Sequence, residues 1–92
     1  MTNDNLSCWV YRSNRHQEMY LYVAEEEDFE AVPDALRERF GEPVLVIELE
    51  LNPDRQLARE DVTMVMSNLR TRGYHLQLPP NLQPELYHGN LD

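Results

Sequence analysis

Hydrophobic and polar residues alternate most clearly near the start of the chain. Residues 18–24 alternate with a period of two, which is the repeat of a β-strand. Residues 8–13 are rich in the aromatic and β-branched types that favour strands. Only residues 14–17 separate the two runs, so the pattern predicts a β-hairpin.

The expected pairing gives this hairpin two different faces. With Asn14 and Arg15 at its tip, Trp9 would face Tyr20 across the hairpin. One face would carry small and aliphatic residues and the other would carry four aromatic rings: Cys8, Val10, Met19, Leu21 and Val23 on the first, and Trp9, Tyr11, Tyr20 and Tyr22 on the second. Neither face is polar, so we expect both to be covered at least in part.

Two later segments have the signals of helices. Residues 28–40 read as a helix in two pieces, with Pro33 at the start of the second piece and Gly41 as its stop. Residues 59–72 predict a second helix that ends before a glycine. Its apolar stripe is typical of a helix that faces a core, and it consists of Val62, Val65, Met66 and Leu69.

Two further strands complete the predicted fold. Residues 44–51 are apolar on both faces at first and then alternate, which predicts a strand that is central in the sheet at its start and half exposed at its end. Residues 74–78 alternate before Pro79 and Pro80. The order is ββαβαβ, followed by a tail, residues 81–92, whose conformation the pattern leaves open. Four strands and two helices predict one compact α/β domain.

The charge balance narrows the class of protein. The chain has 92 residues and a net charge of −9, and all eight basic residues are arginine. Such a balance disfavours binding to nucleic acid or to an anionic membrane, which need a basic surface. A single cysteine fits the reducing cytoplasm, and no apolar run is long enough to span a membrane. We therefore expect a cytoplasmic protein and a monomer, although the edges of a small sheet could pair with another chain.

Several of these segments, taken in order, resemble the YcgL family of small bacterial proteins. They are residues 10–13, 20–23, 28–29, 32–33 and 40–43 and, most specifically, residues 73–80. The resemblance places a YcgL-like domain at residues 6–90, with its core at residues 8–80. It implies an α/β/α sandwich, in which helices cover both faces of a small sheet. The family is a domain of unknown function, so the resemblance implies no substrate, cofactor or catalytic residue.

Metal-binding patterns are weak in this chain. Residues 25–30 hold five carboxylates, but a calcium loop needs spaced ligands and usually a glycine turn, so a solvated helix start is the simpler reading. His16, His75 and His88 are far apart, and with Cys8 they form no zinc spacing. We expect no metal and no cofactor.

A catalytic reading finds little support in the sequence. Ser13 beside Arg12, with a distant His75, would be the basis of a small hydrolase. No GxSxG elbow surrounds the serine, and no third residue is identified that would orient a base. This reading requires a pocket in which Ser13 or His75 has a base within hydrogen-bond reach. We expect a protein that is not an enzyme.

The aromatic residues of the hairpin leave two binding hypotheses. The leading one is a non-enzymatic adaptor that binds a protein partner, because aromatic and arginine side chains are common interface anchors. Its expected surface combines aromatic and polar residues of neighbouring strands, namely Arg12, Tyr20, Tyr22, Gln77, Pro79 and Pro80. The alternative is an RNA-associated protein that stacks bases on the aromatic face beside Arg12 and Arg15. Packing of the same rings beneath a helix or the tail would explain them without any ligand.

Overall fold

The computed structural model describes residues 5–57 and 60–79 of the chain. Its elements follow the predicted ββαβαβ order, and their bounds are β1 (Leu6–Arg12), β2 (Tyr20–Val23), α1 (Asp34–Phe40), β3 (Val44–Leu51), α2 (Val62–Thr71) and β4 (Tyr74–Gln77). Pro80 and the tail, residues 81–92, lie outside the described residues. The predicted element order is therefore confirmed.

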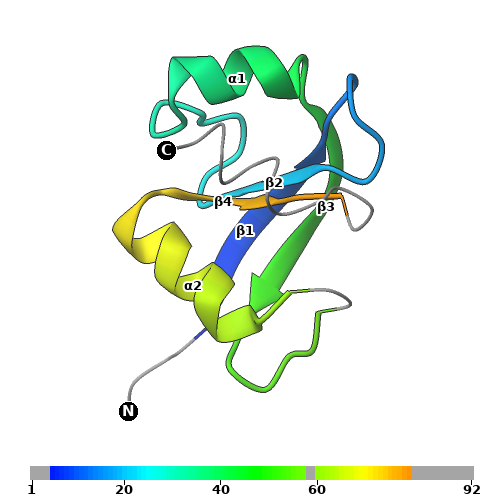
Figure 1. Ribbon diagram of the computed structural model, residues 1–92. Coiled ribbons are helices and arrows are strands. Elements are labelled where there is room, and N and C mark those ends of the chain that lie inside the picture. Colours follow the sequence, from blue (N-terminus) through cyan, green and yellow to red (C-terminus); the bar gives the residue numbers. More distant parts are fainter. Residues whose placement is uncertain (1–4, 58–59, 80–92) are drawn as a thin grey trace, which may run out of the picture.

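The four strands form one antiparallel sheet in the order β3-β1-β2-β4 (Figure 1). β1 and β2 occupy the centre, and β3 and β4 are the edges. The prediction that β3 begins in the centre of the sheet is wrong. An apolar run on both faces suits a buried strand, but it does not determine where that strand lies in the sheet.

The hairpin of β1 and β2 has a different register from the expected one. Tyr20 pairs with Arg12 rather than with Trp9, which is a shift of three residues. An odd shift moves every side chain of one strand to the other face relative to its partner. Trp9 and Tyr11 therefore share a face with Leu21, whereas Tyr20 and Tyr22 lie on the opposite face. The predicted face of four aromatic rings is wrong.

The two helices cover opposite faces of the sheet (Figure 1). The core on the α2 side contains the predicted stripe of α2 and residues of three strands: Val62, Val65, Met66, Leu69, Cys8, Val10, Tyr22 and Leu51. The core on the α1 side consists of Tyr11, Met19, Leu21, Val23, Val32 and Phe40. The α/β/α arrangement is thus confirmed, and apolar residues on both faces of the hairpin are buried by it.

Local signals explain where the helices begin and end. α1 follows Pro33 and a separate turn in which the Val32 N–H donates to the Phe29 carbonyl at 3.0 Å, so the two-piece prediction is confirmed. α2 begins three residues later than expected because Asp61 caps it and accepts from the Thr63 N–H at 3.0 Å. In the described part of the chain, neither helix has the length and apolar character needed to cross a membrane.

Ser13 explains the wider hairpin loop. Its buried hydroxyl donates to the carbonyl of Phe40 and accepts from the N–H groups of Arg15 and His16, both at 3.0 Å. The Ser13 N–H also donates to the carbonyl of Met19 at 2.9 Å, which closes a loop over residues 13–19. One side chain therefore ties the hairpin loop to the last residue of α1.

Replacing this hydroxyl should weaken the fold. We expect Ser13→Ala to lower the free energy of unfolding by about 1–3 kcal/mol, because the buried carbonyl of Phe40 loses its donor. Urea unfolding followed by circular dichroism measures the change. Ser7→Ala, on the exposed part of β1, is the matched control and should change the midpoint little. Equal midpoints for the two variants would contradict the structural role of Ser13.

Candidate functional site at the edge strand β3

The first half of β3 exposes an unusual amount of apolar surface. Val44, Leu45, Val46 and Ile47 are 36%, 47%, 50% and 48% exposed, and they follow one another directly along the strand. β3 has one strand neighbour, β1, so the backbone groups on its other side take no part in the sheet formed by the described residues. Exposed apolar edge strands of this kind are ready to pair with a further strand. β3 is therefore the strongest candidate for a binding surface.

A β-bulge determines how the side chains of β3 point. Val10 pairs with Ile47 and Tyr11 pairs with Leu45, so Val46 is the extra residue of the bulge. Residues directly opposite on neighbouring strands share a face of the sheet. Leu45 consequently lies on the α1 face beside Tyr11, and Ile47 lies on the α2 face beside Val10.

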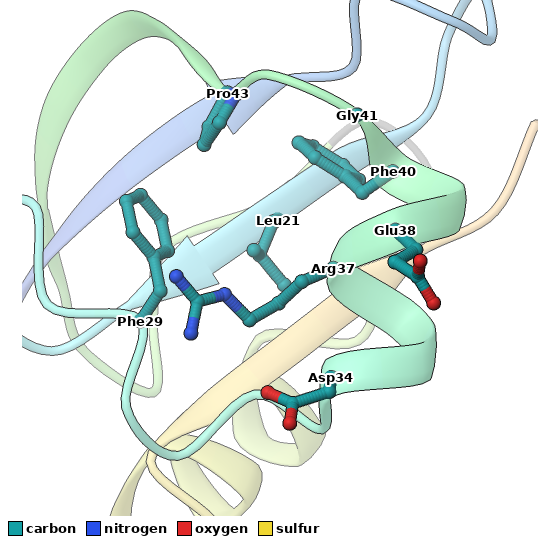
Figure 2. Close-up of a pocket in the computed structure, with 8 residues that line it drawn as sticks. All are labelled: Leu21, Phe29, Asp34, Arg37, Glu38, Phe40, Gly41 and Pro43. Carbon is teal, nitrogen blue, oxygen red and sulfur yellow. The ribbon is translucent and has the colours of Figure 1, made fainter.

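An apolar cavity of about 450 Å³ lies on the α1 face, between α1 and the sheet (Figure 2). Its residues come from β2, from α1 and from the segments on either side of α1, namely Leu21, Phe29, Asp34, Arg37, Glu38, Phe40, Gly41 and Pro43. The side chain of Arg37 extends from α1 toward Phe29 in Figure 2. The cavity combines an apolar lining with one cationic side chain, Arg37, and two carboxylates, Asp34 and Glu38.

A second cavity, of about 290 Å³, connects this region to β3. It shares Phe29 and Pro43 with the first cavity, and it is also lined by Tyr11, Leu45 and two carboxylates, Glu26 and Glu27. Tyr11 fixes its wall, because the Tyr11 hydroxyl accepts from the Glu27 N–H at 2.7 Å and its ring meets Phe29 edge to face at 4.9 Å. Burial raises the pKa of the Tyr11 hydroxyl, so Tyr11 stays neutral.

Exposed carboxylates border this surface on the α1 face. Glu48 lies opposite Trp9 and Glu50 lies opposite Ser7, and both are exposed. Glu26 and Glu27 are also exposed and line the same cavity as Leu45. We call Glu26, Glu27, Glu48 and Glu50 the acidic rim. The rim gives an otherwise apolar strand a strongly negative border.

A separate polar cluster surrounds His75 on β4. The Asn68 amide N–H donates to Nδ1 of His75 at 2.9 Å, so Nε2 carries the proton that it donates to Glu60 at 2.5 Å. Tyr22 meets the imidazole edge to face, with ring centroids 5.5 Å apart. Both ring nitrogens are therefore engaged within the fold, where they hold β4 against α2 and the residue that precedes its cap.

Comparison with known proteins identifies the family. The YcgL domain family matches residues 8–80, which is most of the chain. This chain belongs to the YcgL family. It is 53% identical over 73 residues to a YcgL domain-containing protein of Pseudomonas putida strain W619, a match that covers 79% of this chain and 75% of the relative. A YcgL domain-containing protein of Pseudomonas paraeruginosa strain PA7 is 49% identical over 81 residues, covering 88% and 84% of the two chains. The resemblance seen in the sequence is confirmed.

The surface expected from the sequence lies on the α2 face of this YcgL domain. Arg12, Tyr20 and Gln77 form one row across β1, β2 and β4. The Tyr22 hydroxyl donates to Oε1 of Gln77 at 2.8 Å, and both side chains are buried. Pro79 is also buried, whereas Pro80 lies outside the described residues. Arg12 is exposed and Tyr20 is half-buried, so these two are the accessible part of that surface.

The catalytic and metal-binding candidates of the sequence either lie apart in this YcgL domain or form hydrogen bonds that serve the fold. Ser13 is engaged by the backbone of its own loop and by Phe40, and within residues 5–57 and 60–79 no hydrogen bond joins it to His75. Among the same residues, no three histidine, cysteine or acidic side chains come together as a metal site. His88 lies outside the described residues, and His16 is exposed in the hairpin loop.

The edge position of β3 was not predicted, although two signals for it are present in the sequence. Pro43 precedes the strand, and prolines in sheets are confined to edges, strand starts and bulges. Glu48 and Glu50 then interrupt its apolar run, and charged residues are a common feature of edge strands. Together these signals favour an edge strand over a central one.

Proposed function

We propose that this YcgL domain is a protein-binding module that takes an extended segment of a partner chain alongside β3. The observation that carries the proposal is the run of four exposed apolar residues, Val44 to Ile47, on an edge strand. Strand addition to an open edge is a common mode of peptide recognition, in which the main chain supplies affinity and side-chain pockets supply specificity.

The cavities beside β3 supply the second half of this recognition mode. Leu45 and Phe29 line the smaller cavity, and Phe29 also lines the larger one. A partner side chain on the α1 face, next to Leu45, would therefore meet a preformed space that is lined by these apolar groups and by the carboxylates of Glu26 and Glu27. The larger volume, about 450 Å³, lies within the usual range of ligand pockets, and the smaller, about 290 Å³, lies just below that range.

The proposal treats the domain as non-enzymatic. It is supported by the engagement of the Ser13 hydroxyl and of both His75 nitrogens in bonds that serve the fold. The alternative hypothesis of RNA binding required four aromatic rings on one face of the sheet. The observed register instead places Trp9 and Tyr11 on one face and Tyr20 and Tyr22 on the other.

A charge placed on the edge of β3 should block binding. A library of random twelve-residue linear peptides is selected on the purified protein, and the affinity of a selected peptide is measured by fluorescence anisotropy. We expect Val46→Lys to weaken that affinity at least about tenfold, because a lysine on an edge strand opposes further strand pairing. Val46 is half exposed and has no partner on β1, so the fold should tolerate the change.

Met64→Lys is the matched control for this experiment. Met64 is 62% exposed on α2, so the variant makes the same change of an apolar residue to lysine on another surface. We expect it to leave the peptide affinity unchanged. Failure to select any peptide, or equal losses with the two variants, would argue against recognition at β3.

A further inference from the structure

We infer that the segment bound by β3 is an amphipathic strand in which apolar residues alternate with lysine or arginine. This inference rests on the proposed function and specifies the chemistry of its partner. It follows from the different character of the two faces of β3.

On the α1 face of β3, exposed carboxylates favour a partner strand with positively charged residues. Glu48 and Glu50 are two residues apart, so they point to the same side of the sheet, and both are exposed there. A further strand beside β3 would place its residues directly opposite these carboxylates, where opposite charges stabilise the pair and like charges destabilise it. At Glu50 such a strand would displace the Arg55 guanidinium, which donates to the Glu50 carbonyl at 3.4 Å. Two alternate positions of the partner strand are therefore expected to be basic.

On the α2 face of β3, exposed apolar side chains favour a partner strand with apolar residues. Ile47 lies opposite Val10 and Leu49 lies opposite Cys8, on the side of the core packed under α2. Ile47 is 48% exposed there, so an apolar neighbour would remove its surface from water. Since successive residues of a strand point to opposite faces, these positions alternate with the basic ones.

The acidic rim argues against a second copy of the chain as the occupant. A copy would bring its own Glu26, Glu27, Glu48 and Glu50 to the edge, and each copy carries a net charge of −9. Like charges at close range oppose association. A basic strand neutralises the same groups, so charge complementarity selects a different chain with a cationic face.

Three synthetic peptides of nine residues test this inference. In them valine alternates with arginine, with threonine or with glutamate, and fluorescence anisotropy measures their affinities for the full chain. We expect the arginine peptide to bind at least about fivefold more tightly than the threonine peptide, which corresponds to about 1 kcal/mol, and the glutamate peptide to bind most weakly. The difference should shrink as the salt concentration rises, because the charges are exposed.

Charge reversal on β3 should change the order of the peptides. With Glu48→Arg and Glu50→Arg combined, the glutamate peptide is expected to bind more tightly than the arginine peptide. Glu18→Arg and Glu30→Arg combined make the same change of net charge outside β3 and outside both cavities, and should keep the original order. The combined variant Glu48→Gln and Glu50→Gln keeps the size of both side chains and should remove most of the preference for the arginine peptide. It replaces the charge-reversed variant if that variant does not fold.

A fourth peptide separates the two proposals. It has the valine–arginine sequence with alternate backbone nitrogens methylated, which removes strand pairing and keeps the charges. If the three parent peptides bind equally and methylation abolishes binding, the inference about charge is wrong and the proposed function stands. If methylation changes nothing, or if no peptide binds, both fail. Sedimentation equilibrium that shows a dimer dissociated by Val46→Lys would identify a second copy as the occupant and overturn the inference.

Discussion

Phe40→Ala is expected to lower the free energy of unfolding by about 3–5 kcal/mol, a large part of the stability of a small domain. Phe40 is 1% exposed and belongs to the core on the α1 side. It also lines the larger cavity, so its removal would enlarge a space that the surrounding residues already leave open. Little relaxation can therefore compensate for the lost contacts.

Urea unfolding of wild type and variant measures this loss. Leu36→Ala is the control, because Leu36 lies on the same helix but is only partly buried against the same core. We expect it to cost clearly less than Phe40→Ala. A loss below about 1 kcal/mol for Phe40→Ala would show that α1 contributes little to the core and that the cavity beneath it collapses freely.

Alkaline pH is expected to destabilise the domain through two buried acids. Burial raises the pKa of the Cys8 thiol from its ordinary value of 9.0 to about 11. Burial, helped by the charge of Glu60, raises the pKa of the Tyr22 hydroxyl from 10.0 to about 12. Both groups hold their protons more tightly in the folded state than in the unfolded state. Their contribution is therefore fully present below pH 9 and is lost as the pH rises.

The loss should come in two overlapping ranges. The stability contributed by the protonated Cys8 thiol is lost between pH 9 and 11, and that contributed by the protonated Tyr22 hydroxyl is lost between pH 10 and 12. For one group, a difference of two pH units corresponds to about 2.7 kcal/mol, so the free energy of unfolding should fall by a few kcal/mol by pH 12. Urea midpoints measured from pH 8 upward follow this fall.

Two variants assign the two ranges to their groups. Cys8→Ala should remove the earlier loss, and Tyr22→Phe should remove the later one. Each variant also changes the stability at neutral pH. The quantity to compare is therefore the slope of the urea midpoint against pH. A midpoint that stays constant from pH 8 to 11 in the wild type would contradict the burial of the Cys8 thiol.

Local features of the sequence were sufficient to predict the elements. The stripe of α2 and its stop at Gly73 lie within about a dozen residues of one another, and each acts on the neighbouring backbone. The same holds for Pro33 at the start of α1. Such signals need no information about the rest of the fold. The cap at Asp61 was not identified, so the predicted start of α2 was three residues early.

Features that depend on distant residues could not be predicted in this way. The hairpin register depends on Ser13, whose acceptor, the carbonyl of Phe40, lies 27 residues further along the chain. Tyr22 finds its hydrogen-bond partner Gln77 across 55 residues. The position of β3 at the edge depends on which strand pairs with β1. An alternating or apolar pattern fixes the type of an element but not its neighbours, so the face of four aromatic rings and the central position of β3 were both predicted wrongly.

The bond from Ser13 to Phe40 also has a dynamic consequence. Because the Ser13 hydroxyl joins the hairpin loop to Phe40, and Oδ1 of Asn14 accepts from the Glu42 N–H at 2.9 Å, we expect the two segments to open together. A partner that enters the cavity beneath α1 and shifts that helix would therefore disturb residues 13–19 as well. Occupancy of the cavity beneath α1 would thus change the stability of the hairpin loop as well.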